Sequence, residues 1–278
     1  MKNGLKMLFN FRLTPIELAP PFGRDGDWSL HWFGLTYGCY WLTVGDTELF
    51  RYRQQFLDLE TEDYDDFGCL PHVDYMVARL WEDVLDILPD VLAPVPPALA
   101  DKLAAPNSEA WRARIEHRLD SHENGLWKPA YEHATEWWRK RQLVSGHLTG
   151  GPKIWFWNDG THIHIEWDNR AIQSEAVAMW TADVGTWLMS VEDFLSEIRT
   201  FDTALIDAMQ QRISQIRLNW PRPDVRLDVN ELALEHADRV QWLARALRQV
   251  DQARLVDWNA IIQAIARVES ETDGLTRP

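Results

Sequence analysis

The sequence predicts an α+β protein in which antiparallel sheets with hairpins pack against several long helices. Short alternating runs rich in aromatic residues, around residues 28–52 and 153–167, are typical of strands. Turn signals separate these runs and favour hairpins. Between and after them lie stretches with apolar residues at helical spacing, the longest from about residue 190 to 216.

The N-terminal sheet is predicted around the stretch Trp28–Leu42, in which six of fifteen residues are aromatic. Residues 7–13 alternate well enough for a preceding strand. Within the stretch, Tyr40 and Leu42 are expected on one face of a strand, and Trp41 and Thr43 on the other. A turn signal at residues 44–48 and a strand-like run at residues 49–52 then extend the sheet.

A first helix is expected after this sheet, with Asp74 as its N-cap and apolar residues at helical spacing up to Leu88. Pro89 is expected to end or kink it, since proline cannot donate the backbone hydrogen bond. The proline-rich segment 89–106 is the most boundary-like part of the chain and holds a short helix at residues 98–104. The predicted parts are therefore 1–105 and 106–278.

The second part is expected to combine helices with a second sheet at about residues 153–189. Helices are predicted at residues 108–119 and 127–143. The Asn158-Asp-Gly160 turn joins two alternating runs into a hairpin, and the segments 176–180 and 186–189 are expected to extend that sheet. Ser190 opens a long helix with a variant of the capping box. Further helices are predicted at residues 230–250 and 258–268.

The formal net charge of −15 limits the classes of partner. Nucleic acids and anionic membrane surfaces are excluded as preferred partners, because both require a basic patch. The basic run at residues 137–141 has a local explanation as cations at a helix C-terminus. An acidic protein is steered towards basic partners, although acidity also serves solubility alone. The sixteen tryptophans are expected in the core or, for some, on a binding face.

Cys39 and Cys69 are the only cysteines, which is too few for a disulfide scaffold or an unaided zinc site. The N-terminus lacks the apolar core of a signal peptide, and no apolar run has the length of a membrane span. A cytoplasmic protein with both thiols reduced is therefore expected.

An acidic stretch at residues 58–67 is the predicted partner-binding site. It holds six carboxylates in nine residues, with two aromatic anchors at its end: Asp58, Glu60, Glu62, Asp63, Tyr64, Asp65, Asp66 and Phe67. One interpretation is a docking loop for a cationic partner, and another is a solvated loop that repels itself. A calcium loop is a third, although the order of ligands typical of such loops is absent.

His162, His164 and Glu166 form the best pattern for a metal site, since all three lie on one face of a predicted strand. A polar outer face on a half-buried sheet explains the same pattern without a metal. Motifs for a nucleophile elbow, a phosphate-binding loop, a dinucleotide fold or a zinc protease are absent. No cofactor and no catalytic residue is therefore expected.

The chain resembles an uncharacterised bacterial family, a domain of unknown function with a WFGLTxGxYW-type segment. The segments that carry the resemblance are Leu30–Trp41, Leu49–Tyr52, Val77–Asp83, Ile154–Trp167 and Phe194–Ile213. It covers about residues 7–217, which favours one integrated unit. Members of such acidic, motif-poor families are similar in character to immunity proteins of toxin systems.

The expected function is therefore a non-enzymatic, acidic protein-binding protein, an immunity-type inhibitor of a bacterial toxin with a basic surface. The alternative is a metal-dependent hydrolase that uses His162, His164 and Glu166. A scaffolding oligomer is a third hypothesis, for which a large exposed apolar patch would be the sign.

Overall fold

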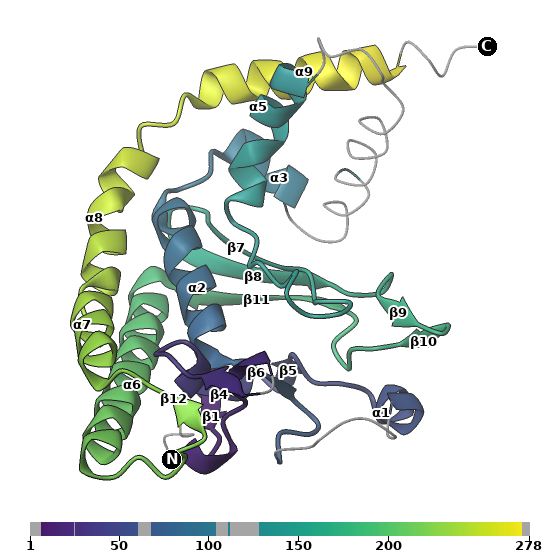
Figure 1. Ribbon diagram of the computed structural model, residues 1–278. Helices are drawn as coiled ribbons and strands as arrows, with labels where there is room; N and C mark the ends of the chain where they lie inside the picture. The colour runs from purple at the N-terminus through teal and green to yellow at the C-terminus, as the bar shows by residue number, and fades with distance from the viewer. Residues whose placement is uncertain (1–6, 25, 61–67, 104–110, 112–127, 274–278) are drawn as a thin grey trace, which may run out of the picture.

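The computed structural model describes residues 7–24, 26–60, 68–103, 111 and 128–273. They form an α+β fold, which confirms the predicted class (Figure 1). Antiparallel sheets lie in the middle of the molecule, and α6, α7 and α8 lie along one side of it.

The first sheet is built on β4 (Tyr37–Val44). This strand pairs antiparallel with β1 (Phe9–Leu13), β5 (Thr47–Leu49) and β6 (Val73–Met76). A smaller sheet beside it was not predicted. In it, β3 pairs antiparallel with β2 and parallel with β12, and the bounds are β2 (Phe22–Arg24), β3 (Asp27–Ser29) and β12 (Val225–Arg226).

The side chains of β4 alternate as the sequence predicts. Tyr40 and Leu42 are fully buried, whereas Trp41 and Thr43 are only partly buried. The run at residues 49–52 is not the continuous strand that was expected. Phe50 has a positive φ of 64°, so the backbone turns after β5.

Cys39 and Cys69 form a disulfide, with their Cα atoms 5.2 Å apart. The expectation of two reduced thiols is therefore wrong for this structure. The pairing of β4 with β6 explains the proximity, because Tyr40 lies opposite Val73, only four residues after Cys69.

The second sheet has the order β11-β8-β7 and confirms the predicted hairpin. Its strands are β7 (Ile154–Asn158), β8 (His162–Asp168) and β11 (Val184–Ser190). The turn is closed by Gly160, whose backbone N–H donates to Oδ1 of Asn158 at 2.7 Å. The segment 176–180 does not extend this sheet, since β9 (Gln173–Ser174) and β10 (Val177–Ala178) pair only with each other among the described strands.

The central helix α2 (Val77–Leu92) packs against both sheets and against α8. Two details of its prediction are wrong. Asp74 lies in β6 and accepts a hydrogen bond from the Tyr37 hydroxyl at 2.7 Å, so it does not cap the helix. Pro89 lies inside the helix, which continues for about one turn because the Pro89 carbonyl still accepts the N–H of Ala93 at 3.2 Å.

The long helix α6 (Val191–Leu218) begins as predicted, since Oγ of Ser190 accepts the N–H of Asp193 at 3.0 Å. The predicted helix 230–250 is instead two helices with a break at residues 240–241. They are α7 (Val229–Arg239), capped by Asp228, and α8 (Trp242–Ala253). The last helix is α9 (Trp258–Asp273).

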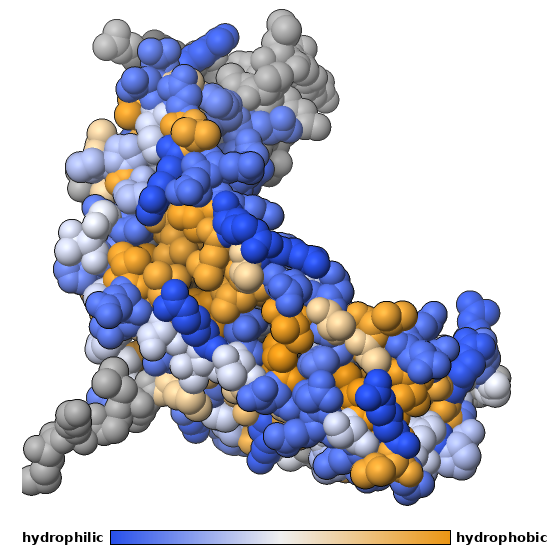
Figure 2. Space-filling model, turned by 90° about the vertical axis from the view of Figure 1, so that its left-hand side faces the viewer, coloured by the Kyte–Doolittle hydropathy of each residue, from blue (hydrophilic) through white to orange (hydrophobic). Residues whose placement is uncertain are grey.

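Two hydrophobic cores share the second sheet. The main core lies between the sheets, α2 and α6, and it contains Ile154 and Phe156 from one face of β7. The opposite face of β7 contributes Trp155 and Trp157 to a smaller core with three helices. These are α3 (Pro97–Leu103), α5 (Lys128–Arg139) and α9. Figure 2 shows the side where α7 and α8 lie, with hydrophobic residues gathered near its centre.

Candidate functional site

The structure describes only the beginning of the predicted acidic site. Asp58 is exposed on α1 (Gln54–Glu60) and accepts a hydrogen bond from Nε2 of Gln54 at 2.8 Å. The side chain of Glu60 and the whole of residues 61–67 lie outside the described residues. The latter segment holds the remaining predicted site residues, Glu62, Asp63, Tyr64, Asp65, Asp66 and Phe67. The docking-loop hypothesis for this stretch stays a prediction.

The segment that leads into α1 lies beside the residues that precede β11. The N–H of Arg53 donates to the carbonyl of Met179 at 2.8 Å, and its Nε donates to the carbonyl of Trp180 at 2.7 Å. Nη2 of Arg53 also forms an ion pair with Asp183 at 2.6 Å. In addition, α1 contacts β10. The acidic stretch therefore begins near the N-terminal end of β11.

Strand β11 carries large apolar side chains at the border of its sheet. Among the described strands only β8 pairs with it, so its other edge has no partner strand in that part of the chain. Val184 and Trp187 are each 43% exposed, and Leu188 is 52% exposed. Trp187 is the only tryptophan of the described residues that is exposed. Edge strands with exposed apolar residues are unusual unless they are used for binding.

Trp187 is held against the turn between β4 and β5. Gly45 has a positive φ of 61°, and a β-carbon there would lie 2.7 Å from the indole ring. The next residue, Asp46, is exposed. Asp183 directly precedes β11, and the exposed Glu192 follows it on α6. Carboxylates therefore lie beside Trp187 and next to both ends of β11, and the one at the N-terminal end, Asp183, is paired with Arg53.

The structure does not gather His162, His164 and Glu166 into a metal site. His162 is exposed, whereas Glu166 is buried. Nε2 of His164 lies 2.8 Å from Asp159, and its ring stacks on Trp157 at 3.7 Å. No group of three or more potential metal ligands was found in the described parts of the chain.

A cluster of titratable side chains that was not predicted joins β4, β6, α2 and the loop after α5. The hydroxyl of Tyr40 lies 3.0 Å from Nε2 of His147. The imidazole of His147 also contacts the ring of Tyr75, with centroids 4.6 Å apart. On α2, Nη2 of Arg79 lies 3.0 Å from Oδ1 of Asp83.

Burial shifts the pKa values in this cluster. Loss of hydration raises the pKa of Asp83 to about 7, although Arg79 opposes the shift. Burial, with a contribution from Arg79, lowers the pKa of His147 to about 4. Three buried atoms of the cluster have no hydrogen-bond partner in the described structure: Nε of Arg79, Oδ2 of Asp83 and Nδ1 of His147. Asp83 can therefore exchange a proton near neutral pH, while His147 is neutral.

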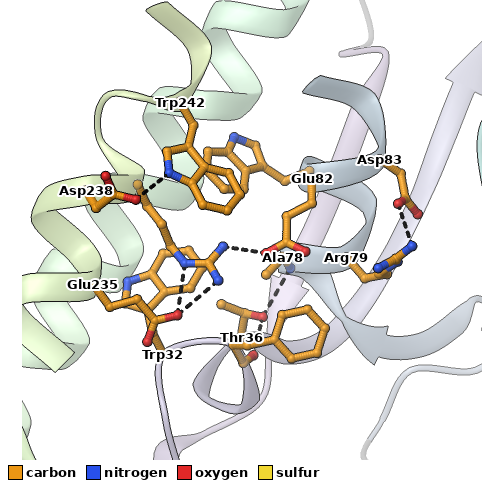
Figure 3. Close-up of polar contacts among 12 residues, drawn as sticks. Trp32, Thr36, Ala78, Arg79, Glu82, Asp83, Glu235, Asp238 and Trp242 are labelled. Carbon is orange, nitrogen blue, oxygen red and sulfur yellow. Dashed lines mark hydrogen bonds and ion pairs between the residues drawn. The ribbon is translucent and has the colours of Figure 1, made fainter. Parts of the chain in front are cut away.

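The other side of α2 carries a fully paired cluster. Figure 3 shows Glu82 and Glu235 pointing at one guanidinium, which lies between Trp32 and Trp242. That guanidinium belongs to Arg239, whose central carbon is 4.3 Å and 4.6 Å from the two ring centroids. It pairs with Glu82 and, at 2.9 Å, with Glu235. Because each group is satisfied, this cluster fastens α7 to α2 and leaves little capacity for a ligand.

The sequence held a signal for only one of these features. The aromatic stretch indicated that Tyr40 would lie on a packed strand. Asp83, at a polar position of the predicted helix, was expected towards the outside and is buried instead. His147 lies 107 residues from Tyr40, and Arg239 lies 157 residues from Glu82. No local spacing connects such pairs.

Comparisons with known proteins gave one match. A family model described as "Family of unknown function (DUF5984)" matches residues 8–264. No curated protein and no solved structure matches the chain. None of the described helices has the length and apolar character needed to cross a bilayer.

Proposed function

The chain belongs to the family of unknown function DUF5984, and we propose that it is a non-enzymatic protein-binding protein whose partner has a basic surface. The observation on which the proposal rests is the apolar edge of β11, where Trp187 and Leu188 are exposed. Tryptophan is one of the residue types that are enriched among binding hot spots.

The shape of the site favours an extended segment of the partner. A strand edge offers backbone N–H and C=O groups to a second strand, and side chains on its two faces give specificity. On β11, Leu188 and Val184 lie on one face and Trp187 on the other, because neighbouring residues of a strand alternate. An added strand would cover apolar side chains on both faces.

The charge around the edge favours a cationic segment. Asp46 is exposed in the turn that Trp187 contacts, and Glu192 and Asp193 are exposed just after the C-terminal end of β11. The net charge of −15 adds a long-range attraction for a basic partner. The acidic stretch that begins at Asp58 starts near the same end of β11, as the contacts of Arg53 with residues 179–183 indicate.

The more specific proposal is an immunity-type inhibitor that masks a basic toxin domain. It rests on the acidity, the edge and the resemblance in character to such inhibitors. Its partner would be a basic protein that is harmful to the cell in the absence of this chain.

A salt-dependent capture experiment tests the binding proposal. Three tagged proteins are used to capture partners from the native host. They are the wild type, the double variant Trp187→Ala/Leu188→Ser and the control Leu255→Ser. Leu255 is 83% exposed in the link between α8 and α9, so the control removes an equally apolar side chain elsewhere. We expect a stoichiometric basic partner that is retained by the control and lost from the double variant, because loss of a hot-spot tryptophan weakens binding by about thirtyfold or more.

The outcomes separate the parts of the proposal. A partner that both variants retain would refute the role of β11. A partner unaffected by added salt would refute the electrostatic part. For the inhibitor proposal, the captured protein is expressed alone and with this chain, and growth should be restored by the wild type but not by the double variant.

A second candidate function, acid–base catalysis, is favoured by Asp83. A carboxyl group with a pKa of about 7 beside Arg79, His147 and Tyr40 has the properties of a proton-transfer group. Wild type and Asp83→Asn should be compared on a panel of chromogenic esters, phosphoesters and glycosides. Turnover that the substitution abolishes would support catalysis, and equal activity of the two proteins would remove the candidate.

A further inference from the structure

A pocket of about 380 Å³ lies between α6 and α7, on the helices that flank the sheets. Two helix faces form it, since its residues recur at spacings of three, four and seven along each helix. They are Gln210, Ile213 and Arg217 from α6, and Ala233, His236, Ala237 and Val240 from α7 and the turn after it. The two alanines leave room opposite Ile213.

The proton position on His236 follows from its contact behind the pocket. The indole N–H of Trp32, which can only donate, lies 3.2 Å from Nδ1 of His236. Nδ1 is therefore the acceptor, and Nε2 carries the proton of the neutral imidazole. His236 is only 7% exposed as a residue, and it lines the pocket. The nitrogen of His236 that remains available as a donor is therefore Nε2.

Arg217 adds a positive charge at the pocket. It is exposed in the last turn of α6 and forms no ion pair with the described residues. Two other arginines in this part of the chain are paired with carboxylates. Arg222 pairs with Asp224, and Arg239 with Glu82 and Glu235. None of the seven described lining residues is acidic.

We propose that this pocket binds a small organic carboxylate with an apolar body. The guanidinium of Arg217 matches a carboxylate with two parallel hydrogen bonds, and the Nε2–H of His236 and the amide of Gln210 supply further donors. Ile213, Val240 and the two alanines form the apolar walls. The volume lies at the lower end of the range for small-molecule sites.

The probe is octanoate, and its binding to the full chain is measured by calorimetric titration. We expect saturable binding of one octanoate per chain, weakened tenfold or more by Arg217→Gln, because a hydrogen bond to a charged group is lost. The matched control is Arg199→Gln, which removes an exposed arginine from the same helix and should change the affinity less than twofold. Ala233→Leu fills the pocket without a change of charge and should also weaken binding.

Comparison ligands and spectroscopy complete the test. Octanol, which has the same chain but no charge, should bind at least tenfold more weakly than octanoate. The ¹⁵N resonance of Nε2 in His236 should shift on titration. The absence of saturable binding at millimolar octanoate, unchanged binding by Arg217→Gln, or equal binding of octanol would each overturn the proposal.

The pocket inference is independent of the proposed partner binding. The variant Trp187→Ala/Leu188→Ser changes β11 and not the pocket, so it should bind octanoate as the wild type does. Loss of octanoate binding in that variant would contradict an independent site between α6 and α7.

Discussion

Trp187 lies directly over Gly45, so that a β-carbon on Gly45 would be 2.7 Å from its indole ring. This contact fixes the orientation of the one described tryptophan that is exposed, and it depends on a residue without a side chain. The positive φ of 61° at Gly45 also disfavours any residue with a β-carbon.

Gly45→Ala is therefore expected to lower the free energy of unfolding by about 1–3 kcal/mol, partly from the backbone and partly from the clash with Trp187. Urea unfolding of the two single variants and of the double variant Gly45→Ala/Trp187→Ala separates these contributions. Gly45→Ala should lower the free energy of unfolding by less when residue 187 is alanine than when it is tryptophan. If the decrease is the same in both backgrounds, the indole does not lie against Gly45 in solution.

The buried Asp83 predicts a pH dependence of stability. Its pKa is about 7 in the folded chain and about 3.8 in the unfolded chain, so the unfolded state loses the proton first as pH rises. As pH rises from about 4 to about 7, the contribution of Asp83 to the free energy of unfolding therefore falls by up to about 4 kcal/mol. Asp83→Asn cannot ionise, so its stability relative to the wild type should rise between pH 5 and pH 8.

Urea unfolding of both proteins at the two pH values measures this difference. Comparison with the wild type cancels the contributions of the other titrating groups, among them His147, whose lowered pKa acts in the opposite direction. Asp207→Asn, an exposed substitution on α6, serves as the control and should show a difference that does not depend on pH. If the difference in stability between Asp83→Asn and the wild type did not depend on pH, the pKa of Asp83 would not be raised in the folded chain.

Arg239 is expected to be essential for the attachment of α7 to α2. Arg239→Met keeps much of the side-chain volume but leaves Glu82 and Glu235 without their cation, which should cost about 3–5 kcal/mol. Part of this loss should be recovered by adding Glu82→Gln, because an unpaired buried charge is then removed. Arg248→Met on the exposed side of α8 should change stability by only about 0.5 kcal/mol. If Arg239→Met and Arg248→Met lowered stability by similar amounts, the special role of Arg239 would be refuted.

The local parts of the fold could be predicted because their causes are local. The alternation of β4, the turn at Asn158–Gly160 and the cap at Ser190 each depend on residues within a few positions of one another. The break between α7 and α8 could not be predicted in this way, since no proline or glycine occurs between residues 229 and 253. Apolar periodicity continues through it.

The candidate sites depend on topology, which the local pattern does not contain. Trp187 alternates like a core residue and lies opposite Ile165, which is fully buried. It is exposed because no described strand follows β11 in the sheet. In the same way, the donor at His236 depends on Trp32, which is 204 residues away in the sequence. A single sequence provides the residue types, and the sheet order decides which of them reach the surface.

The disulfide between Cys39 and Cys69 gives the last prediction. The chain has only these two cysteines, so oxidised protein unfolded without reductant should show no reactive thiol, and reduced protein should show two. A cross-link between residues 30 positions apart restricts the unfolded chain and is expected to stabilise the fold by about 3–4 kcal/mol. The double variant Cys39→Ser/Cys69→Ser should unfold near the urea concentration of the reduced wild type. Two free thiols in the air-oxidised protein would contradict the pairing, and they would restore the reduced state that the sequence alone predicts.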